Sequence, residues 1–226
     1  MLILGIETAS STASVALMRE DTLLSEHSVH HTRTHSETVM PMVEHMLTEL
    51  GFAPNQLGAI AVNCGPGSFT GVRIGVCAAN AMGAALHIPV VGVNALEVLY
   101  ENVRFWPGKV CAMIDARNDN AYFAQYENGA QAAAPSAEEV AVYLQNVPAG
   151  ALFVGDGAMA YVHVILEAVK NAKIAPEDTS LSHASALCRI AGRRLAQAEE
   201  PAMEAIPLYL RPSQAERMWQ KLHADA

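Results

Sequence analysis

Short apolar runs separated by small polar turns predict the strands of an α/β protein. Leu2–Glu7 and residues 13–19 are two such runs, and the polar turn between them favours a hairpin. Residues 21–30 predict a third extended segment of the same meander. After them, buried strands alternate with segments of helical spacing. Strands are expected at Ala59–Asn63 and Val90–Val93, and helices at 36–50, 71–86 and 95–103.

The pattern restarts after Pro107-Gly108, which indicates two related halves. An offset of 108 residues, the difference between positions 114 and 6, places Ile6-Glu7 on Ile114-Asp115. Each of these pairs ends an apolar run that a polar turn follows. We therefore predict two αβ lobes, formed by domains 1–106 and 107–226.

Local patterns predict the remaining elements of the second half. Ser136 and Glu139 have the spacing of a capping box, so we expect a helix at 136–146. The Ala-rich stretch before it, residues 129–135, is interpreted as a loop. A strand at 151–154 and a helix at 182–198 follow. The chain is expected to end in a short extended piece at 208–213 and a final short helix.

Composition and charge favour a protein partner and argue against nucleic acid as a stand-alone ligand. Half of the chain is hydrophobic (51%) and only 16% is charged, which leaves more apolar surface than one compact monomer hides. The formal net charge is −9, and no basic run is longer than Arg193-Arg194. The start lacks the features of a signal peptide, and four scattered cysteines are typical of reduced thiols. We therefore expect a cytoplasmic protein without a membrane segment.

A glycine-rich stretch between a predicted strand and a predicted helix, residues 64–75, suggests a nucleotide site but does not complete one. Such turns usually present backbone N–H groups to a phosphate. A Walker A loop needs a Lys, and none lies between Leu2 and Val103. A dinucleotide fingerprint needs a third Gly where this chain has Thr70.

Three acids and a histidine pair are further candidates for chemistry. Glu7 and Asp115 could hold a metal–phosphate complex between the lobes, or each could close its hairpin by accepting turn N–H groups. Asp156, between two glycines, could approach a nucleotide or be a turn residue. His31 and His35 have the spacing of a metal pair, but no acid accompanies them, so a polar loop before a capped helix is favoured.

The helix predicted at 71–86 carries small residues at intervals of four, namely Gly71, Gly75, Ala79 and Gly83. Such a stripe suggests that another helix approaches this one closely. Glycine costs a helix about 1 kcal/mol relative to Ala, so three glycines in one stripe need compensation. The preceding helix is rich in methionine, an adaptable interface residue. The alternative is that both helices only cover their own sheet. The candidate interface residues are Val39, Met40, Val43, Met46, Leu47, Gly71, Gly75, Ala79 and Gly83.

Five segments stand out along the chain, at residues 4–8, 65–75, 91–93, 114–117 and 208–211. Together they resemble the bacterial TsaB (YeaZ) family across essentially the whole chain. The resemblance implies an actin-like ATPase (ASKHA) fold of two related RNase H-like lobes, the second reduced. It also implies a role in forming N6-threonylcarbamoyladenosine next to the anticodon of tRNAs that read codons starting with A. In that family the protein is the non-catalytic paralogue, dimerisation partner and scaffold of TsaD.

The resemblance also implies where the chemistry lies. TsaD carries a metal-binding H-x-x-x-H motif, and its histidine positions are Ala95 and Leu99 here, neither of which coordinates a metal. We therefore expect no enzyme activity, no metal and no cofactor of its own, with ATP and a metal on the TsaD-like partner. TsaE and tRNA are expected to be reached only through the complex, and the isolated chain is expected to form a homodimer. The possible vestigial nucleotide or phosphate site comprises Glu7, Thr8, Gly65, Gly67, Ser68, Asp115 and Arg117.

Two other functions remain open at this point. An active ATPase or sugar-type kinase of the same fold would depend on Glu7, Asp115 and the glycine turns. A metallopeptidase would need a bound catalytic metal.

Overall fold

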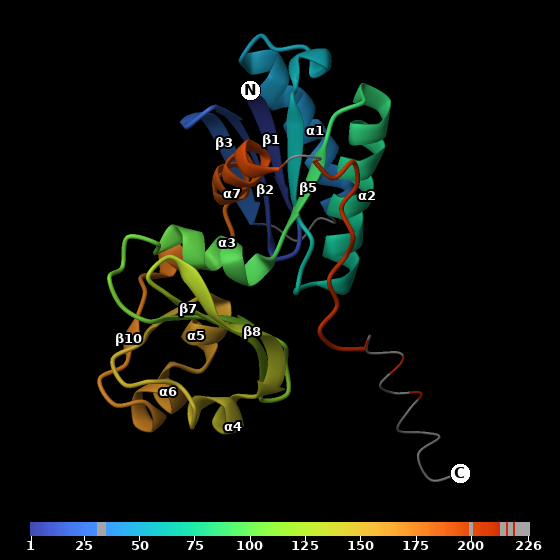
Figure 1. The fold of residues 1–226 in the computed structure, drawn as a ribbon. Coiled ribbons are helices and arrows are strands. Elements are labelled where there is room, and N and C mark those ends of the chain that lie inside the picture. The colour runs from blue at the N-terminus through green and yellow to red at the C-terminus, as the bar shows by residue number, and fades with distance from the viewer. Residues whose placement is uncertain (31–34, 199–200, 213–215, 217–218, 220–226) are drawn as a thin grey trace.

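The first lobe is built on a five-stranded sheet of mixed direction (Figure 1). The computed structural model describes residues 1–30, 35–198, 201–212, 216 and 219. The first three strands form the predicted antiparallel meander, and the last two run parallel to the first. In the order β3-β2-β1-β4-β5, the strands are β1 (Leu2–Glu7), β2 (Thr12–Arg19), β3 (Thr22–His30), β4 (Ala59–Asn63) and β5 (Val90–Val93).

The second sheet repeats this topology, in the order β10-β9-β6-β7-β8. Its meander begins at positions 110, 120 and 130, where the first begins at 2, 12 and 22, so the offset of 108 holds for all three strands. The two-lobed α/β fold is therefore confirmed. The strands are β6 (Val110–Asp115), β7 (Asn120–Glu127), β8 (Ala130–Glu139), β9 (Leu152–Val154) and β10 (Lys173–Ile174).

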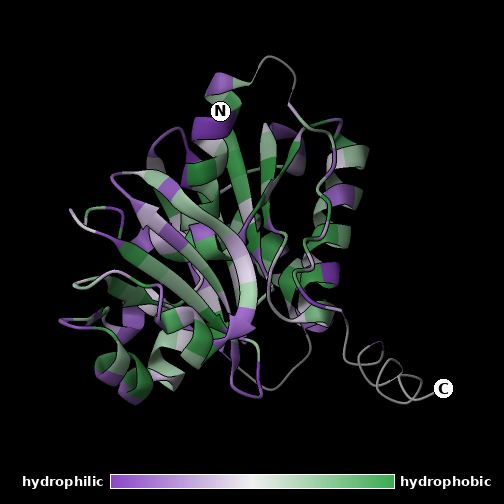
Figure 2. Cartoon of the chain, turned by 60° about the horizontal axis from the view of Figure 1, so that its bottom comes forward, coloured by the Kyte–Doolittle hydropathy of each residue, from purple (hydrophilic) through white to green (hydrophobic). Residues whose placement is uncertain are grey.

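Helices cover both faces of each sheet. On the first sheet, α1 (His35–Glu49) and α2 (Phe69–Leu86) bury their apolar sides on one face, and α7 (Ala184–Gln197) covers the other. On the second, α3 (Ala95–Asn102) packs on the face toward the first lobe. Its other face is covered by the short helices α4 (Val140–Leu144), α5 (Asp156–Ala160) and α6 (Val162–Ala168). Apolar residues accordingly run along the central strands, and polar residues gather at many of the loops (Figure 2).

The predicted division into domains 1–106 and 107–226 is wrong for the last part of the chain. Helix α7 packs against β1 and β2, so the chain returns to the first lobe after forming the second. The segment after α7 then runs along α2 and β5 (Figure 1). There the Val90 N–H donates to the Ala202 carbonyl at 3.0 Å, and the Leu208 N–H donates to the Cys64 carbonyl at 2.7 Å. We call residues 201–212 the C-terminal strap.

The helix expected at 136–146 begins only at Val140, because residues 130–139 form β8. Ser136 pairs with Phe123 and Glu139 with Asn120 on β7, so cross-strand pairing outweighs the local capping-box signal. The Ala-rich stretch interpreted as a loop belongs to the same strand. The expected end of the extended piece and the final short helix lie mostly outside the described residues.

Close packing of α7 on β1 depends on Gly5. A Cβ added at Gly5 would collide with the Ala184 carbonyl oxygen and lie 2.8 Å from the Cys188 sulfur. A Cβ at Gly192, within α7, would meet only the Ile3 side chain, at an ordinary 3.6 Å. The two glycines therefore predict opposite effects of the same substitution.

We expect Gly5→Ala to lower the free energy of unfolding by about 1–3 kcal/mol, because a buried backbone carbonyl must move. Gly192→Ala should raise it by about 0.5–1 kcal/mol, because Ala favours the helix and fits. Urea denaturation of both variants measures the difference. Equal effects of the two substitutions would contradict this packing.

Candidate functional site

The glycine loop between β4 and α2 holds neighbouring backbone instead of leaving a phosphate cradle. Gly65 has φ of +100°, a conformation that requires glycine. Its N–H donates to the Asn63 side-chain oxygen at 2.9 Å, and the Ser68 N–H donates to the Ala9 carbonyl at 2.7 Å. A Cβ at Gly67 would collide with that same carbonyl. The chain's own oxygens therefore accept the N–H groups of Gly65 and Ser68, two of the donors expected to face a phosphate.

The start of α2 is closed against β1 in the same way. Ser68 caps the helix by accepting the Gly71 N–H at 3.2 Å. The buried Thr8 hydroxyl donates to the Gly71 carbonyl at 2.7 Å. A Cβ on Gly71 or Gly75 would collide with the Thr8 carbonyl or hydroxyl oxygen, so the glycines bring α2 onto the end of β1. Thr8 therefore positions a helix, and its hydroxyl is directed into the protein.

Glu7 is fully buried and its carboxylate is saturated with donors. Oε1 accepts the N–H groups of Ala9 and Ser10 at 2.7 and 3.3 Å. Oε2 accepts the Asn63 amide and the Ser182 hydroxyl, each at 2.5 Å. Burial raises the pKa of Glu7, and these hydrogen bonds partly oppose that rise. The hairpin-closing interpretation is therefore the better one. The Glu7 carboxylate also holds the start of α7, because Ser182 lies just before that helix.

The matching acid of the second lobe is more open. Asp115 accepts the Arg117 N–H at 2.9 Å and the Tyr161 hydroxyl at 3.3 Å. Its own N–H donates to a carboxylate oxygen of Asp156 at 3.1 Å, so Asp156 closes this turn. The Arg117 side chain is 86% exposed, with Nε 3.8 Å from Asp115. Both acids thus accept turn N–H groups, but only Glu7 is sealed.

Two places were candidates for a metal, positions 95 and 99 and the pair His31 and His35. The described residues contain no group of three His, Cys, Asp or Glu side chains suited to a metal. Ala95 and Leu99 lie on α3 and are both buried, and Leu99 packs in the core against the second sheet. The His35 ring nitrogen Nε2 lies 2.9 Å from the Ser10 carbonyl, and His31 is outside the described residues.

The predicted interface residues mostly face the chain's own sheet, and this corrects their assignment. Gly83, for example, brings α2 onto Val90 of β5. Met40 is the exception and is 41% exposed. The glycine stripe therefore allows helix-on-sheet contact, which was the alternative interpretation. The residues buried inside the first lobe are Val39, Val43, Met46, Leu47, Gly71, Gly75, Ala79 and Gly83.

The opposite face of α2 is exposed, and from Cys77 onward its exposed side chains are small and apolar. By length and composition alone, α2 is long and apolar enough to cross a membrane. Cys77 is exposed, and so are Ala81, Ala84 and Ala85. On the neighbouring helix α1, Met40 and Pro41 are exposed as well. We call this surface the outer helical face.

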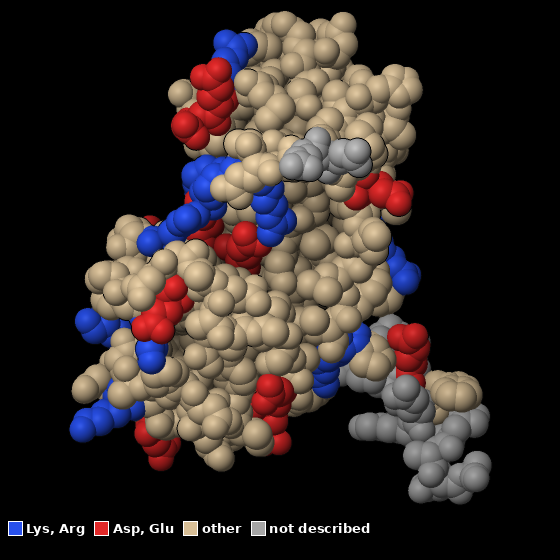
Figure 3. Space-filling model, viewed as in Figure 1, with Lys and Arg blue, Asp and Glu red and all other residues tan. Residues whose placement is uncertain are grey.

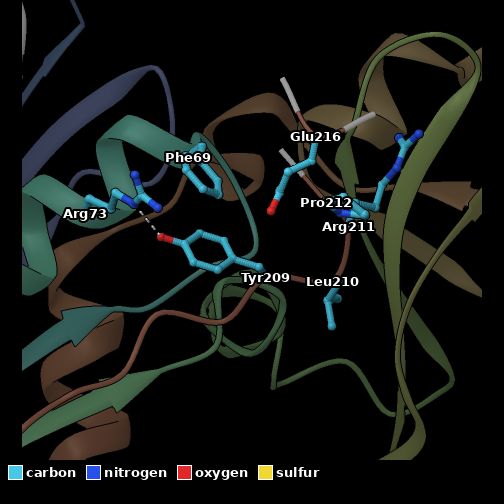
Figure 4. A pocket seen from close by; sticks show the side chains of 7 residues that line it. All are labelled: Phe69, Arg73, Tyr209, Leu210, Arg211, Pro212 and Glu216. Carbon is cyan, nitrogen blue, oxygen red and sulfur yellow. Dashed lines mark hydrogen bonds between the residues drawn. The ribbon is translucent and has the colours of Figure 1, made fainter. Parts of the chain in front are cut away.

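A hollow of about 490 Å³ lies where the strap passes the start of α2 (Figure 4). The Arg73 guanidinium lies 4.0 Å from the centre of the Phe69 ring and donates to the Tyr209 hydroxyl at 3.0 Å. The Phe69 and Tyr209 rings stack at 4.4 Å. Further along the strap, Arg211 donates to the Ala116 carbonyl of the second lobe at 3.2 Å.

Comparison with known proteins identifies the family. The family described as "TsaD: tRNA N6-adenosine threonylcarbamoyltransferase" matches residues 24–219. The tRNA threonylcarbamoyladenosine biosynthesis protein TsaB of Escherichia coli is 33% identical, with 98% of each chain covered. That of Bacillus subtilis is 41% identical over 57% of each chain. The structure of YeaZ from Pseudomonas aeruginosa superposes with a TM-score of 0.79 at 31% identity, covering 92% of this chain and 99% of the other. The chain belongs to the TsaB (YeaZ) family.

The fold has wider relatives. A ROK hexokinase from Thermus thermophilus matches with a TM-score of 0.50 at 11% identity, over 83% of this chain and 98% of its own. This likeness supports the ASKHA fold of the TsaB-family chain and nothing about its activity.

Two of the segments that carry the TsaB resemblance meet in space. Residues 65–75 and 208–211 are far apart in sequence, yet Phe69 and Arg73 contact Tyr209 directly. Sequence reasoning noted both segments without pairing them. The available signal was chemical, because an arginine and aromatic residues in separate unexplained motifs suit a stacked contact.

The sealed carboxylate of the TsaB-family chain makes a testable contrast. We expect Glu7→Ala to lower the free energy of unfolding by about 2–4 kcal/mol, because it leaves buried donors without an acceptor. Asp115→Ala should cost about 1 kcal/mol or less, because water can reach the groups that it leaves. Chemical denaturation of both variants compares them. A Glu7→Ala protein as stable as Asp115→Ala would show that the network holds little energy.

Proposed function

We propose that this chain is a non-catalytic subunit that pairs with a TsaD-like catalytic subunit and supports it in forming N6-threonylcarbamoyladenosine next to the anticodon of tRNAs that read codons starting with A. The names of the TsaB relatives, one of them matched over 98% of both chains, support the pathway. The observation that carries the non-catalytic role is the closed end of β1. There the chain itself occupies the groups that an ASKHA enzyme would turn toward a nucleotide.

A nucleotide with its metal does not fit the residues present. Glu7 Oε1 and Oε2 both already accept hydrogen bonds, and no Lys lies in the glycine loop. The loop amides of Gly65 and Ser68 donate to protein oxygens. ATP and a metal therefore belong to the catalytic partner in this proposal. An ATPase or kinase activity of this chain is disfavoured for the same reason, and a metallopeptidase lacks ligands among the described residues.

The outer helical face is the surface that this proposal assigns to the partner. Small exposed side chains such as Ala81 and Ala85 let another helix approach α2 closely. The two helices remain those expected from the sequence, but their outward sides replace the buried stripe. An exposed apolar face of this kind also suits a second copy of the chain, so we propose a homodimer when the partner is absent.

The remaining partners follow from that pairing. A TsaE-like small ATPase would act on the complex, and the complex would bring tRNA to the catalytic subunit. This work belongs in the cytoplasm, where tRNA is modified. Reconstitution of the modification with and without the chain tests the role. The proposal requires product only when both subunits are present, and product formed by this chain alone would overturn it.

A charge placed on the outer helical face should break the pairing. We expect Ala81→Glu to weaken co-purification with the TsaD-like subunit at least tenfold, because an uncompensated carboxylate would be buried at the interface. Ala168→Glu, at an exposed alanine on α6, is the matched control and should leave it unchanged. Unfolding curves of both variants check that each folds. Undiminished pairing by Ala81→Glu would remove α2 from the interface.

A further inference from the structure

Four arginines gather around two carboxylates at the junction of the two lobes. Helix α3, on the second sheet, meets α7, on the first, and Lys or Arg side chains gather around acidic ones in this region (Figure 3). Glu101 of α3 is within 4.0 Å of the guanidinium groups of Arg104, Arg189 and Arg193. A chain of net charge −9 thus places three cations around one carboxylate.

One arginine is sufficient to neutralise Glu101. Arg193 binds it through both terminal nitrogens, at 2.9 and 2.6 Å, which is the bidentate geometry of a strong pair. The other two contacts are longer, 3.4 Å for Arg104 and 3.6 Å for Arg189. The positive charge of these two guanidinium groups is therefore not balanced by Glu101.

The neighbouring pair adds no negative excess. Arg194 binds Glu97 at 2.5 Å and also donates to the Gly92 carbonyl at 2.7 Å. Each acid of the cluster thus has its own arginine. The junction as a whole keeps two unbalanced positive charges, those of Arg104 and Arg189.

A hollow of about 210 Å³ opens beside this cluster. Its lining includes Arg104, Arg193, Arg194, Gln131 and Tyr126, together with the paired carboxylates of Glu97 and Glu101, whereas Arg189 stands behind Glu101 and does not line it. The Tyr126 hydroxyl is buried and has no hydrogen-bond partner within the part of the chain that the structure describes. A buried polar group without a partner is costly, so an unpaired donor at an arginine-lined hollow points to an acceptor that binds there. Burial raises the pKa of Tyr126, which keeps its hydroxyl a donor at neutral pH.

We infer that this hollow, which we call the junction site, binds a phosphoryl group. Its oxygens match the Arg104 guanidinium, the Gln131 amide and the Tyr126 hydroxyl, and the charge of Arg189 favours an anion there by offsetting that of Glu101. The group can come from an RNA backbone or from a free phosphorylated compound. The RNA source rests on the proposed role in tRNA modification, whereas the phosphoryl chemistry rests on the site alone.

The test uses the full-length protein with two probes, inorganic pyrophosphate in calorimetry and fluorescently labelled tRNA in anisotropy. The Arg104→Gln/Arg189→Gln double variant removes the excess charge and leaves the Arg193–Glu101 pair intact. Arg19→Gln/Lys170→Gln removes the same charge elsewhere on the surface and is the matched control. For whichever probe the wild type binds, we expect the affinity of the double variant to be at least tenfold lower. The affinity of the control should change less than twofold.

The two sources give different results. If tRNA is the ligand, pyrophosphate competes only weakly with it, and the slope of log affinity against log salt falls by roughly 0.7–0.9 for each arginine lost. If a free compound is the ligand, pyrophosphate binds and tRNA does not. Binding of neither probe by the wild type, or equal binding by the double variant, would overturn the junction site.

Two further measurements test the role of the Tyr126 hydroxyl and the independence of the junction site from subunit pairing. Tyr126→Phe should weaken binding several-fold while the free energy of unfolding stays equal or rises, because the unpaired hydroxyl is gone. A loss of stability with unchanged binding would make that hydroxyl structural and contradict its place in the site. The double variant should still co-purify with the TsaD-like subunit through α2. Loss of pairing with retained pyrophosphate binding would count against the proposed function and not against the site.

Discussion

The rest of the structure depends on the burial of one carboxylate, that of Glu7. Its oxygens gather donors from the β1–β2 turn, from Asn63 at the end of β4, and from Ser182 before α7. These segments are far apart in sequence, and the carboxylate fixes them at the end of the first strand. A buried charge is tolerated only where hydrogen bonds replace its water, and here every one of these donors comes from the chain itself. The same contacts that stabilise the first lobe therefore occupy the carboxylate that the sequence offered for a metal–phosphate complex.

Much of the fold was predictable because the chain repeats itself. The correspondence of Glu7 with Asp115 predicted the second meander, and the offset also holds for β8, where local reasoning wrongly gave a loop and a helix. Cross-strand pairing decided there, and no local pattern reports it. The return of α7 to the first lobe was missed for a similar reason. An amphipathic helix shows that it has an apolar side, but not which sheet that side covers, although Gly5 in β1 was a signal of close approach.

The candidate sites were harder to predict than the elements. The stripe through Gly71, Gly75 and Gly83 correctly indicates close packing of α2, yet spacing alone cannot say whether a partner or the chain's own sheet lies against it. The junction site could not be predicted from sequence spacing either. In the sequence Arg193 is half of an isolated basic pair, and its acceptor Glu101 is 92 residues away. Only the folded chain shows that one acid is shared among three arginines.

These observations describe an ATPase-like fold in which the chain's own contacts close the end of β1. The most direct test of that central claim is equilibrium binding of Mg-ATP to the isolated chain by calorimetry. A closed β1 end predicts no saturable binding up to millimolar nucleotide. Saturable binding by the wild type that is lost in a folded Glu7→Gln variant would contradict it, because it would place the nucleotide on the carboxylate that the structure shows to be sealed.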